Sequence, residues 1–154
     1  MIQRIQTVYM LIAELLVGVL YFVPFGEIAG KDGTIYRVGI NGIFPEGNPK
    51  SEAISSNFPL VILWVVSLIL IVVTIFLFEN RKRQMRLLMI NILILFALGG
   101  LIFFDVWSGS KQLSGHYSLS IYFVFPAIAA ILLIMGYRAI GKDEALVRSI
   151  DRIR

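Results

Sequence analysis

The chain is organised as four long apolar blocks separated by polar stretches. The blocks cover residues 5–23, 58–78, 87–104 and 119–139 and hold few charged side chains. A helix rises about 1.5 Å per residue, so roughly 20 apolar residues cross about 30 Å of hydrocarbon. The pattern therefore predicts an all-α membrane protein with four transmembrane helices, arranged as a single domain over residues 1–154.

The stretch between the first two blocks, residues 24–57, has a different pattern. Its segment GEIAGKDGTIYRVGI contains Asp32-Gly33, a turn signal in which the glycine can supply a positive φ. Tyr36, Val38 and Ile40 follow with the alternation of a strand. We expect a small β-hairpin in this first outer loop, with its apolar face on the membrane surface or on the helix ends.

The other polar stretches are shorter. Residues 79–86 are expected to form a tight connection and residues 105–118 a second outer loop. In the tail, residues 140–154, Leu146, Ile150 and Ile153 recur at helical spacing. This predicts a short amphipathic C-terminal helix, which either lies on the membrane surface or continues the fourth span.

One proline interrupts the fourth block. Pro126 lacks a backbone N–H and crowds the carbonyl of Tyr122 in a continuous helix. Neighbouring helices can satisfy the carbonyl that is left without a donor. We therefore expect a kink inside the fourth span.

Composition indicates the class of protein, and the distribution of charge indicates its orientation in the membrane. With 58% apolar and 16% charged residues the chain is not an ordinary soluble domain, and without cysteine it has no disulfides or thiolate chemistry. Ten of its 14 Lys and Arg residues fall at the N-terminus, in residues 79–86 and from Arg138 to the C-terminus. The positive-inside rule then places both termini in the cytoplasm. The basic rim is expected to contact anionic lipid of the bilayer rather than nucleic acid.

Three segments carry a resemblance to a known family. The opening MIQRIQTVYMLIA, the turn KDGTIY and the closing DEALVRSIDRIR resemble the domain-of-unknown-function family 4293, small four-span membrane proteins from Bacteroidota. The resemblance covers essentially the whole chain. It implies four helices and a multi-pass location in the bacterial inner membrane, and it transfers no functional residue.

Glu14 is the main candidate for a functional residue. It lies about nine residues into the first block, so roughly 14 Å deep, and an acid at that depth is a functional-site hypothesis by default. It shares a helical face with the smaller or more polar residues Thr7, Met10, Gly18 and Tyr21. No Lys or Arg lies deep in any predicted span to pair with it.

Depth counting places Ser67 of the second block at a similar level, so we expect a contact between Glu14 and Ser67. Without a counter-charge, Glu14 is expected to be protonated or in contact with water. Three interpretations stay open: an acid buried in helix packing within this protein or its partner, a group that handles protons or cations, or a misjudged depth.

Two further polar residues were considered. Asn91, about four residues inside the third block, is expected to bridge helices or to reach the membrane interface. His116 lies in the second outer loop with Asp105 and Lys111 near it in sequence, which is a weak catalytic signal. No nucleophile elbow, P-loop, dinucleotide fingerprint or zincin motif occurs. We predict no catalytic, cofactor-binding or metal-binding residue, and no cofactor.

These observations favour a non-enzymatic accessory or scaffold subunit that binds another integral membrane protein, or a second copy, through the Glu14 face or the outer hairpin. The alternative is a small oligomeric proton-linked transporter or channel that uses Glu14 and the Pro126 kink. A membrane enzyme comes third, because it rests only on His116 and Asp105. The candidate intramembrane residues, for function or for packing, are Glu14, Ser67, Asn91 and Pro126.

Overall fold

The computed structural model describes residues 3–31, 33–46, 55–78 and 80–151, with side chains described from Ile5 to Ala145. Within these residues the chain is mostly helical and carries a small antiparallel sheet. The helices are α1 (Gln3–Val19), α2 (Phe58–Phe76), α3 (Arg81–Gln112), the 3-10 helix η1 (Ile121–Val124) and α4 (Phe125–Asp151). The strands are β1 (Gly26–Ala29), β2 (Ile35–Gly39), β3 (Gly42–Pro45) and β4 (His116–Leu119).

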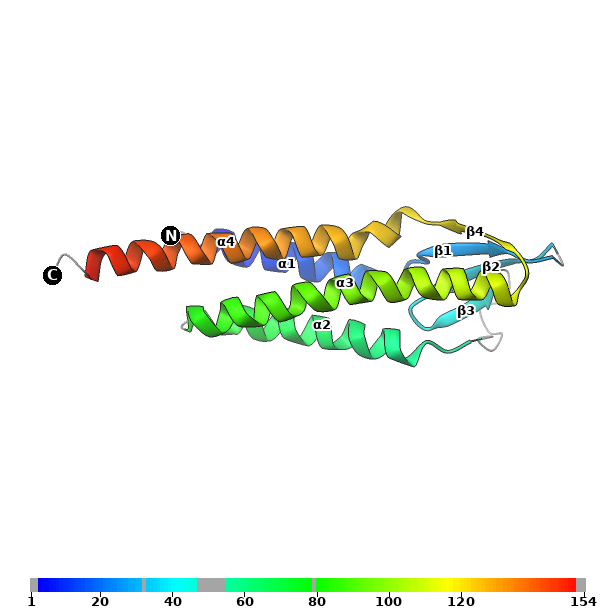
Figure 1. Cartoon of the computed structure of the whole chain (residues 1–154), viewed down its shortest axis with the longest axis horizontal. Helices are drawn as coiled ribbons and strands as arrows, with labels where there is room; N and C mark the ends of the chain where they lie inside the picture. The colour runs from blue at the N-terminus through cyan, green and yellow to red at the C-terminus, as the bar shows by residue number, and fades with distance from the viewer. Residues whose placement is uncertain (1–2, 32, 47–54, 79, 152–154) are drawn as a thin grey trace.

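The four α-helices run side by side in an elongated bundle with the sheet at one end (Figure 1). α1 begins and α4 ends at the opposite end of the bundle. α1 packs mainly along α4, α4 along α3, and α3 along α2. The buried core runs the length of the bundle and continues into the sheet, through residues such as Met10, Leu95, Leu133 and Val38.

Three helical segments are long and apolar enough to cross a membrane: Phe58–Phe76, Arg81–Gln112 and Ile121–Ala145. α1 is shorter, with 17 residues, or about 25 Å at 1.5 Å per residue. It ends at Val19 and not at residue 23, because the backbone N–H of Leu20 bonds back to the Val17 carbonyl at 3.3 Å and closes the last turn. The expected span of residues 5–23 is therefore too long at its C-terminal end.

α3 is much longer than the predicted span of residues 87–104. Its 32 residues include most of the expected connection at 79–86 and half of the expected loop at 105–118. The extension toward the sheet is stabilised by packing, since a Cβ at Gly26 would meet Val106 at 2.8 Å. Likewise, a Cβ at Gly109 would meet Ile43 at 2.7 Å. The loop prediction for residues 105–112 is wrong because the helix buries one side against the sheet.

The sheet has the strand order β3-β2-β1-β4 and is antiparallel throughout. The expected hairpin corresponds to β1 and β2, and two further strands extend it. β4 comes from the second outer loop and was not predicted. Gly115 permits its close approach, because a Cβ there would lie 2.1 Å from the Ala29 carbonyl oxygen.

The turn between β1 and β2 has the expected positive φ at Gly33, +73°. The Gly30 N–H bonds to the Thr34 carbonyl at 2.9 Å, and the Gly33 N–H bonds to the Gly30 carbonyl at 3.2 Å. Asp32, the other half of the turn signal, lies outside the described residues. Gly30 and Thr34 therefore close a connection of three residues, which sets Glu27 directly opposite Arg37.

The apolar face of the hairpin lies on the helix ends. Val38 and Ile40 are fully buried, and Tyr36 packs against the same core. The neighbouring Ile28 contacts the end of α3 at Gly109, where a Cβ would meet it at 2.9 Å. Of the two expected placements, the helix ends are therefore the observed one.

Pro126 does not kink a span. α4 begins at Phe125, after the 3-10 turn of η1, so Pro126 lies in the first turn of α4, where its missing N–H leaves no bond unmade. Pro126 has no N–H to donate to the Tyr122 carbonyl. That carbonyl accepts a hydrogen bond from the Phe125 N–H instead. The prediction of a kink inside the fourth span is wrong because the helix starts at the proline.

α4 is continuous to Asp151, so the tail does not form a separate short helix. The alternative of a continuation of the fourth span is the one observed. Near its C-terminal end α4 is joined to the start of α1 by Gln6, whose Nε2 donates to Asp143 Oδ2 at 2.7 Å. The side chains of Leu146 and Ile150 and all of Ile153 lie outside the description, so the amphipathic pattern of the tail stays a prediction.

Candidate functional site

Large apolar side chains cover the outer surface of all four α-helices. A soluble protein rarely exposes apolar patches larger than a few hundred Å². Here the exposed residues recur on every helix of the bundle, and they include Leu15, Ile62, Phe76, Leu93, Phe96 and Ile131. Together with the three membrane-length helices, this surface is compatible with a membrane protein.

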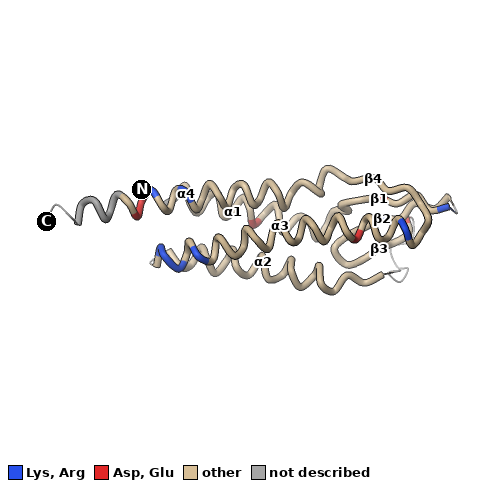
Figure 2. The backbone as a smooth tube through the Cα atoms, viewed as in Figure 1, with Lys and Arg blue, Asp and Glu red and all other residues tan. Residues whose placement is uncertain are grey.

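The basic residues gather at the two ends of the bundle. Figure 2 shows Lys and Arg at the end where α3 starts and near the sheet, with none along the middle of the described helices. The first end carries Arg81, Lys82, Arg83, Arg86, Arg138 and Lys142, and the sheet end carries Lys31, Arg37 and Lys111. An apolar middle with charged ends is compatible with a membrane protein.

Glu14 lies in the middle of α1 and is partly buried. Its Oε2 atom is shielded from solvent and has no hydrogen-bond partner within the part of the chain that the structure describes. No hydrogen bond joins Glu14 to Ser67 among the described residues, and the Ser67 hydroxyl donates to Asn91 instead. A buried, unpaired polar atom is unfavourable by about 1–3 kcal/mol, so this carboxyl group requires a further explanation.

Ser67 is paired with Asn91 across the interface of α2 and α3. The Ser67 hydroxyl donates to Asn91 Oδ1 at 2.9 Å, and Asn91 Nδ2 donates to the Ser67 carbonyl at 3.4 Å. Both side chains are fully buried. Of the two placements considered for Asn91, the bridge between helices is the observed one, and this pair is satisfied without a ligand.

A second polar bridge lies nearer the basic end. Gln84 Nε2 of α3 donates to the Thr74 carbonyl of α2 at 3.1 Å, and the Thr74 hydroxyl donates to the Leu70 carbonyl at 2.6 Å. The buried polar groups of α2 and α3 therefore hold these two helices together. None of these hydrogen bonds extends to Glu14.

The C-terminal end of α1 is in contact with α2. Trp64 of α2 donates its indole N–H to the Val17 carbonyl at 2.7 Å and stacks on Tyr21, with ring centroids 5.5 Å apart. Of the stripe predicted from sequence, Met10 points into the core and is fully buried.

Space is available beside Glu14. Gly18 lies one turn further along α1, and a Cβ added there would meet nothing within 4 Å. Small residues at such positions let another helix approach closely in a membrane. Glu14 and Gly18 therefore lie one turn apart on α1 with open space at Gly18, and we call this pair of residues the Glu14 notch.

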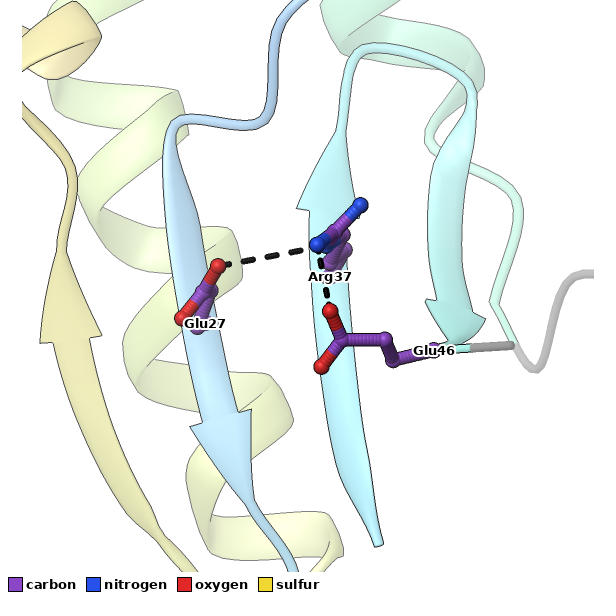
Figure 3. A network of polar contacts seen from close by, with 3 residues as sticks. All are labelled: Glu27, Arg37 and Glu46. Atoms are coloured by element: carbon purple, nitrogen blue, oxygen red, sulfur yellow. Dashed lines mark hydrogen bonds and ion pairs between the residues drawn. The ribbon is translucent and has the colours of Figure 1, made fainter. Parts of the chain in front are cut away.

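A second recessed site lies where α1 meets the sheet. It is a cleft of about 450 Å³, lined by residues 21–24 on one side and by Arg37, Asn41, Phe44 and Glu46 on the other. Phe22 at its edge is 81% exposed. Figure 3 shows Arg37 between two acids: its Nε lies 3.9 Å from Glu27 Oε1, and its terminal nitrogen pairs with Glu46.

This charged network was not predicted from the sequence. Glu27 is set opposite Arg37 by the three-residue connection between β1 and β2. A two-residue turn at Asp32-Gly33 would shift the register by one residue and set Glu27 opposite Val38. The spacing of Gly30 and Thr34 around the turn is the signal in the sequence that could have indicated the pairing of Glu27 with Arg37.

The residues considered for catalysis are not brought together. His116 starts β4, is exposed and lies opposite Ala29 of β1, whereas Asp105 is partly buried in α3. No hydrogen bond or ion pair joins them in the described part of the chain. Among the same residues, no cluster of three or more His, Asp and Glu side chains is placed to hold a metal ion. Nearby, Lys111 Nζ lies 3.8 Å from the centroid of the Trp107 ring.

The family assignment agrees with the resemblance of the sequence. The model of the family described as "Domain of unknown function (DUF4293)" matches residues 2–153, and the chain belongs to that family. No curated protein matches the chain. The family description assigns no activity, so the function is argued from the residues themselves.

Proposed function

We propose that this DUF4293 protein is a non-enzymatic integral membrane protein of the bacterial inner membrane. It spans the bilayer four times, with both termini in the cytoplasm, and acts as an accessory or scaffold subunit that binds another integral membrane protein. The observation that carries this proposal is Glu14, whose Oε2 atom is buried without a partner among the described residues.

The proposal includes α1 as the fourth span. α1 packs along α4 and, like the longer helices, presents large apolar side chains outward, among them Leu11 and Leu15. It begins at the basic end of the bundle and leads into the sheet at the other end (Figure 1). A bundle with this polarity has its basic end in the cytoplasm and the sheet outside, by the positive-inside rule.

The Glu14 notch has the features of a helix-binding site in a membrane. In hydrocarbon, a carboxyl group gains from a hydrogen-bond donor on a neighbouring helix, and Gly18 leaves room for that helix to approach. The partner is therefore a transmembrane helix that carries a donor side chain at mid-membrane depth. The outer cleft with Phe22 and Arg37 offers a second contact for the same partner outside the membrane.

The first test is isolation of the tagged protein from native membranes in mild detergent, with and without chemical crosslinking. We expect a stoichiometric membrane-protein partner with the wild type and at least a fivefold loss of that partner with Glu14→Leu. Ile12→Ala, a change on the same helix at an exposed position on the opposite face, is the matched control and keeps the partner. Recovery of the wild type alone, also after crosslinking, contradicts the proposal, whereas a second copy of this chain makes the partner a homo-oligomer.

A small proton-linked transporter is the alternative that the unpaired Glu14 carboxyl also supports. Two observations weaken the transporter alternative. Ser67 and Asn91 hydrogen-bond to each other, and Pro126 does not kink a span. Purified protein in liposomes distinguishes the two functions. The transporter requires a pH-dependent flux that Glu14→Gln abolishes, and a wild type without flux removes this alternative.

A further inference from the structure

A groove lies between α3 and α4 at the basic end of the bundle. It has a volume of about 340 Å³ and is lined by Met85, Arg86, Met89, Ile90 and Tyr137. Four of these side chains offer apolar or aromatic surface, and Met89 and Ile90 are about half exposed. A groove of this composition favours an apolar ligand with one anionic group.

The groove has a polar end and an apolar end. Arg86 lies one turn before Ile90 on α3, and Met85 lies one turn before Met89, so Arg86 marks the end nearer the start of the helix. That end carries the basic residues of the bundle, among them Lys82, which is one turn before Arg86. Met89 and Ile90 continue the groove toward the middle of the apolar surface.

Arg86 is free to bind an anion. It is exposed, and no carboxylate within the described residues forms an ion pair with it. A guanidinium group binds phosphate with two parallel hydrogen bonds, and a basic segment next to the bilayer attracts anionic lipid. Tyr137 closes the groove from α4 with an aromatic face and a hydroxyl group.

We infer that this groove is a binding site for an anionic phospholipid of the cytoplasmic leaflet. The lipid phosphate pairs with Arg86, and one acyl chain lies along Met89 and Ile90 against Tyr137. The flexible methionine side chains adapt to a hydrocarbon chain. The volume of the groove, about 340 Å³, lies at the lower end of the range for small-molecule sites and suits one acyl chain. A helix, which is about 10 Å across, is too wide for a groove of this size.

This inference rests on the proposed membrane placement and not on the partner at Glu14. The Glu14 notch and the groove lie on different helices, so either site can fail in experiment while the other holds. A lipid in the groove would bridge α3 and α4 at the end where Gly141 of α4 comes close to Met85, with a Cβ at Gly141 3.8 Å from Met85 Cε.

The experiment uses the purified full chain in neutral detergent, titrated with phosphatidylglycerol or phosphatidylethanolamine of the same acyl chains and followed by native mass spectrometry. We expect saturable binding of one phosphatidylglycerol, at least fivefold tighter than phosphatidylethanolamine. Arg86→Gln reduces that preference to less than twofold. Arg83→Gln removes the same charge from the same helix outside the groove and keeps the preference within twofold of the wild type.

A second variant tests the chain-binding part. Met89→Trp fills the groove without changing its charge. We expect this variant to bind both phosphatidylglycerol and phosphatidylethanolamine at least fivefold more weakly than the wild type. Equal losses in Arg86→Gln and Arg83→Gln would overturn the site in favour of diffuse attraction to a basic rim. Binding that does not saturate at one lipid, or a partner helix crosslinked to Ile90 in native membranes, would overturn it as well.

Discussion

Ser67 Oγ donates a hydrogen bond to Asn91 Oδ1 over 2.9 Å, and Asn91 Nδ2 returns one to the Ser67 carbonyl. This pair joins α2 to α3 in the buried centre of the bundle. It also removes Ser67 as a partner for Glu14, which leaves the α1 carboxyl group without a hydrogen bond among the described residues. The buried polar groups of the bundle thus include two hydrogen-bonded bridges between α2 and α3 and, on α1, a carboxyl oxygen without a hydrogen bond among the described residues.

The Ser67–Asn91 pair is expected to stabilise the bundle modestly. Hydrogen bonds between helices in membranes contribute on average about 0.6 kcal/mol and at most about 1.7 kcal/mol. Asn91→Ala and Ser67→Ala should each lower the free energy of unfolding by about 1–2 kcal/mol, and the double variant by clearly less than the sum. Unfolding in mixed micelles by denaturing detergent measures this, and additive losses would show that the two side chains act independently.

Gly115 is expected to be required for the addition of β4 to the sheet. Gly115→Ala places a Cβ 2.1 Å from the Ala29 carbonyl oxygen, so backbone must move and stability should fall by about 2 kcal/mol or more. Gly99→Ala is the matched control, because a Cβ there meets nothing within 4 Å. Hydrogen exchange should rise in Gly26–Ala29 and His116–Leu119 in the first variant only. Unchanged exchange in these strands would contradict the pairing of β1 with β4.

Trp64 is expected to fix the C-terminal end of α1. Trp64→Phe keeps a ring to stack on Tyr21 but removes the indole N–H that bonds to the Val17 carbonyl at 2.7 Å. We expect a loss of about 1 kcal/mol in unfolding free energy and faster amide exchange at residues 20–22. Trp107→Phe serves as the control, since its ring contacts Lys111 and Phe104 instead. Equal effects of both changes would contradict a specific role of the indole N–H.

The orientation can be measured directly because the chain contains no cysteine. Single variants Lys31→Cys and Lys111→Cys should react with a membrane-impermeant maleimide added outside whole spheroplasts. Ile5→Cys and Lys82→Cys should react only after permeabilisation. Labelling of Ile5→Cys together with Lys31→Cys in whole spheroplasts, before permeabilisation, would show that α1 does not cross the bilayer.

The helices of the bundle were predictable because a membrane-length run of apolar residues has few other stable structures. The extent of α3 was not, since residues 105–112 are held helical by contacts of Val106 and Gly109 with the sheet rather than by their own pattern. β4 escaped prediction for the same reason. Its residues His116–Leu119 are all exposed and lack a clear alternation, and pairing with β1 defines the strand.

The candidate site was only partly predictable. Glu14 stood out as a lone acid in an apolar block, but depth counting gives the level of a residue and not the direction in which it points. Ser67 has a suitable depth for Glu14, yet it faces α3, where Asn91 satisfies it. The pairing of Glu27 with Arg37 depended on the length of one turn, which the residues Asp32-Gly33 alone do not define.

The central claim is that the Glu14 notch holds a helix of another membrane protein. A photoreactive phenylalanine analogue at Gly18 tests it in native membranes, with the same analogue at Gly100 of α3 as control, because neither position has an atom within 4 Å of an added Cβ. We predict one discrete protein adduct from position 18, lost on Glu14→Leu, and none from position 100. Lipid adducts alone at position 18, or the same protein adduct from both positions, would contradict the account.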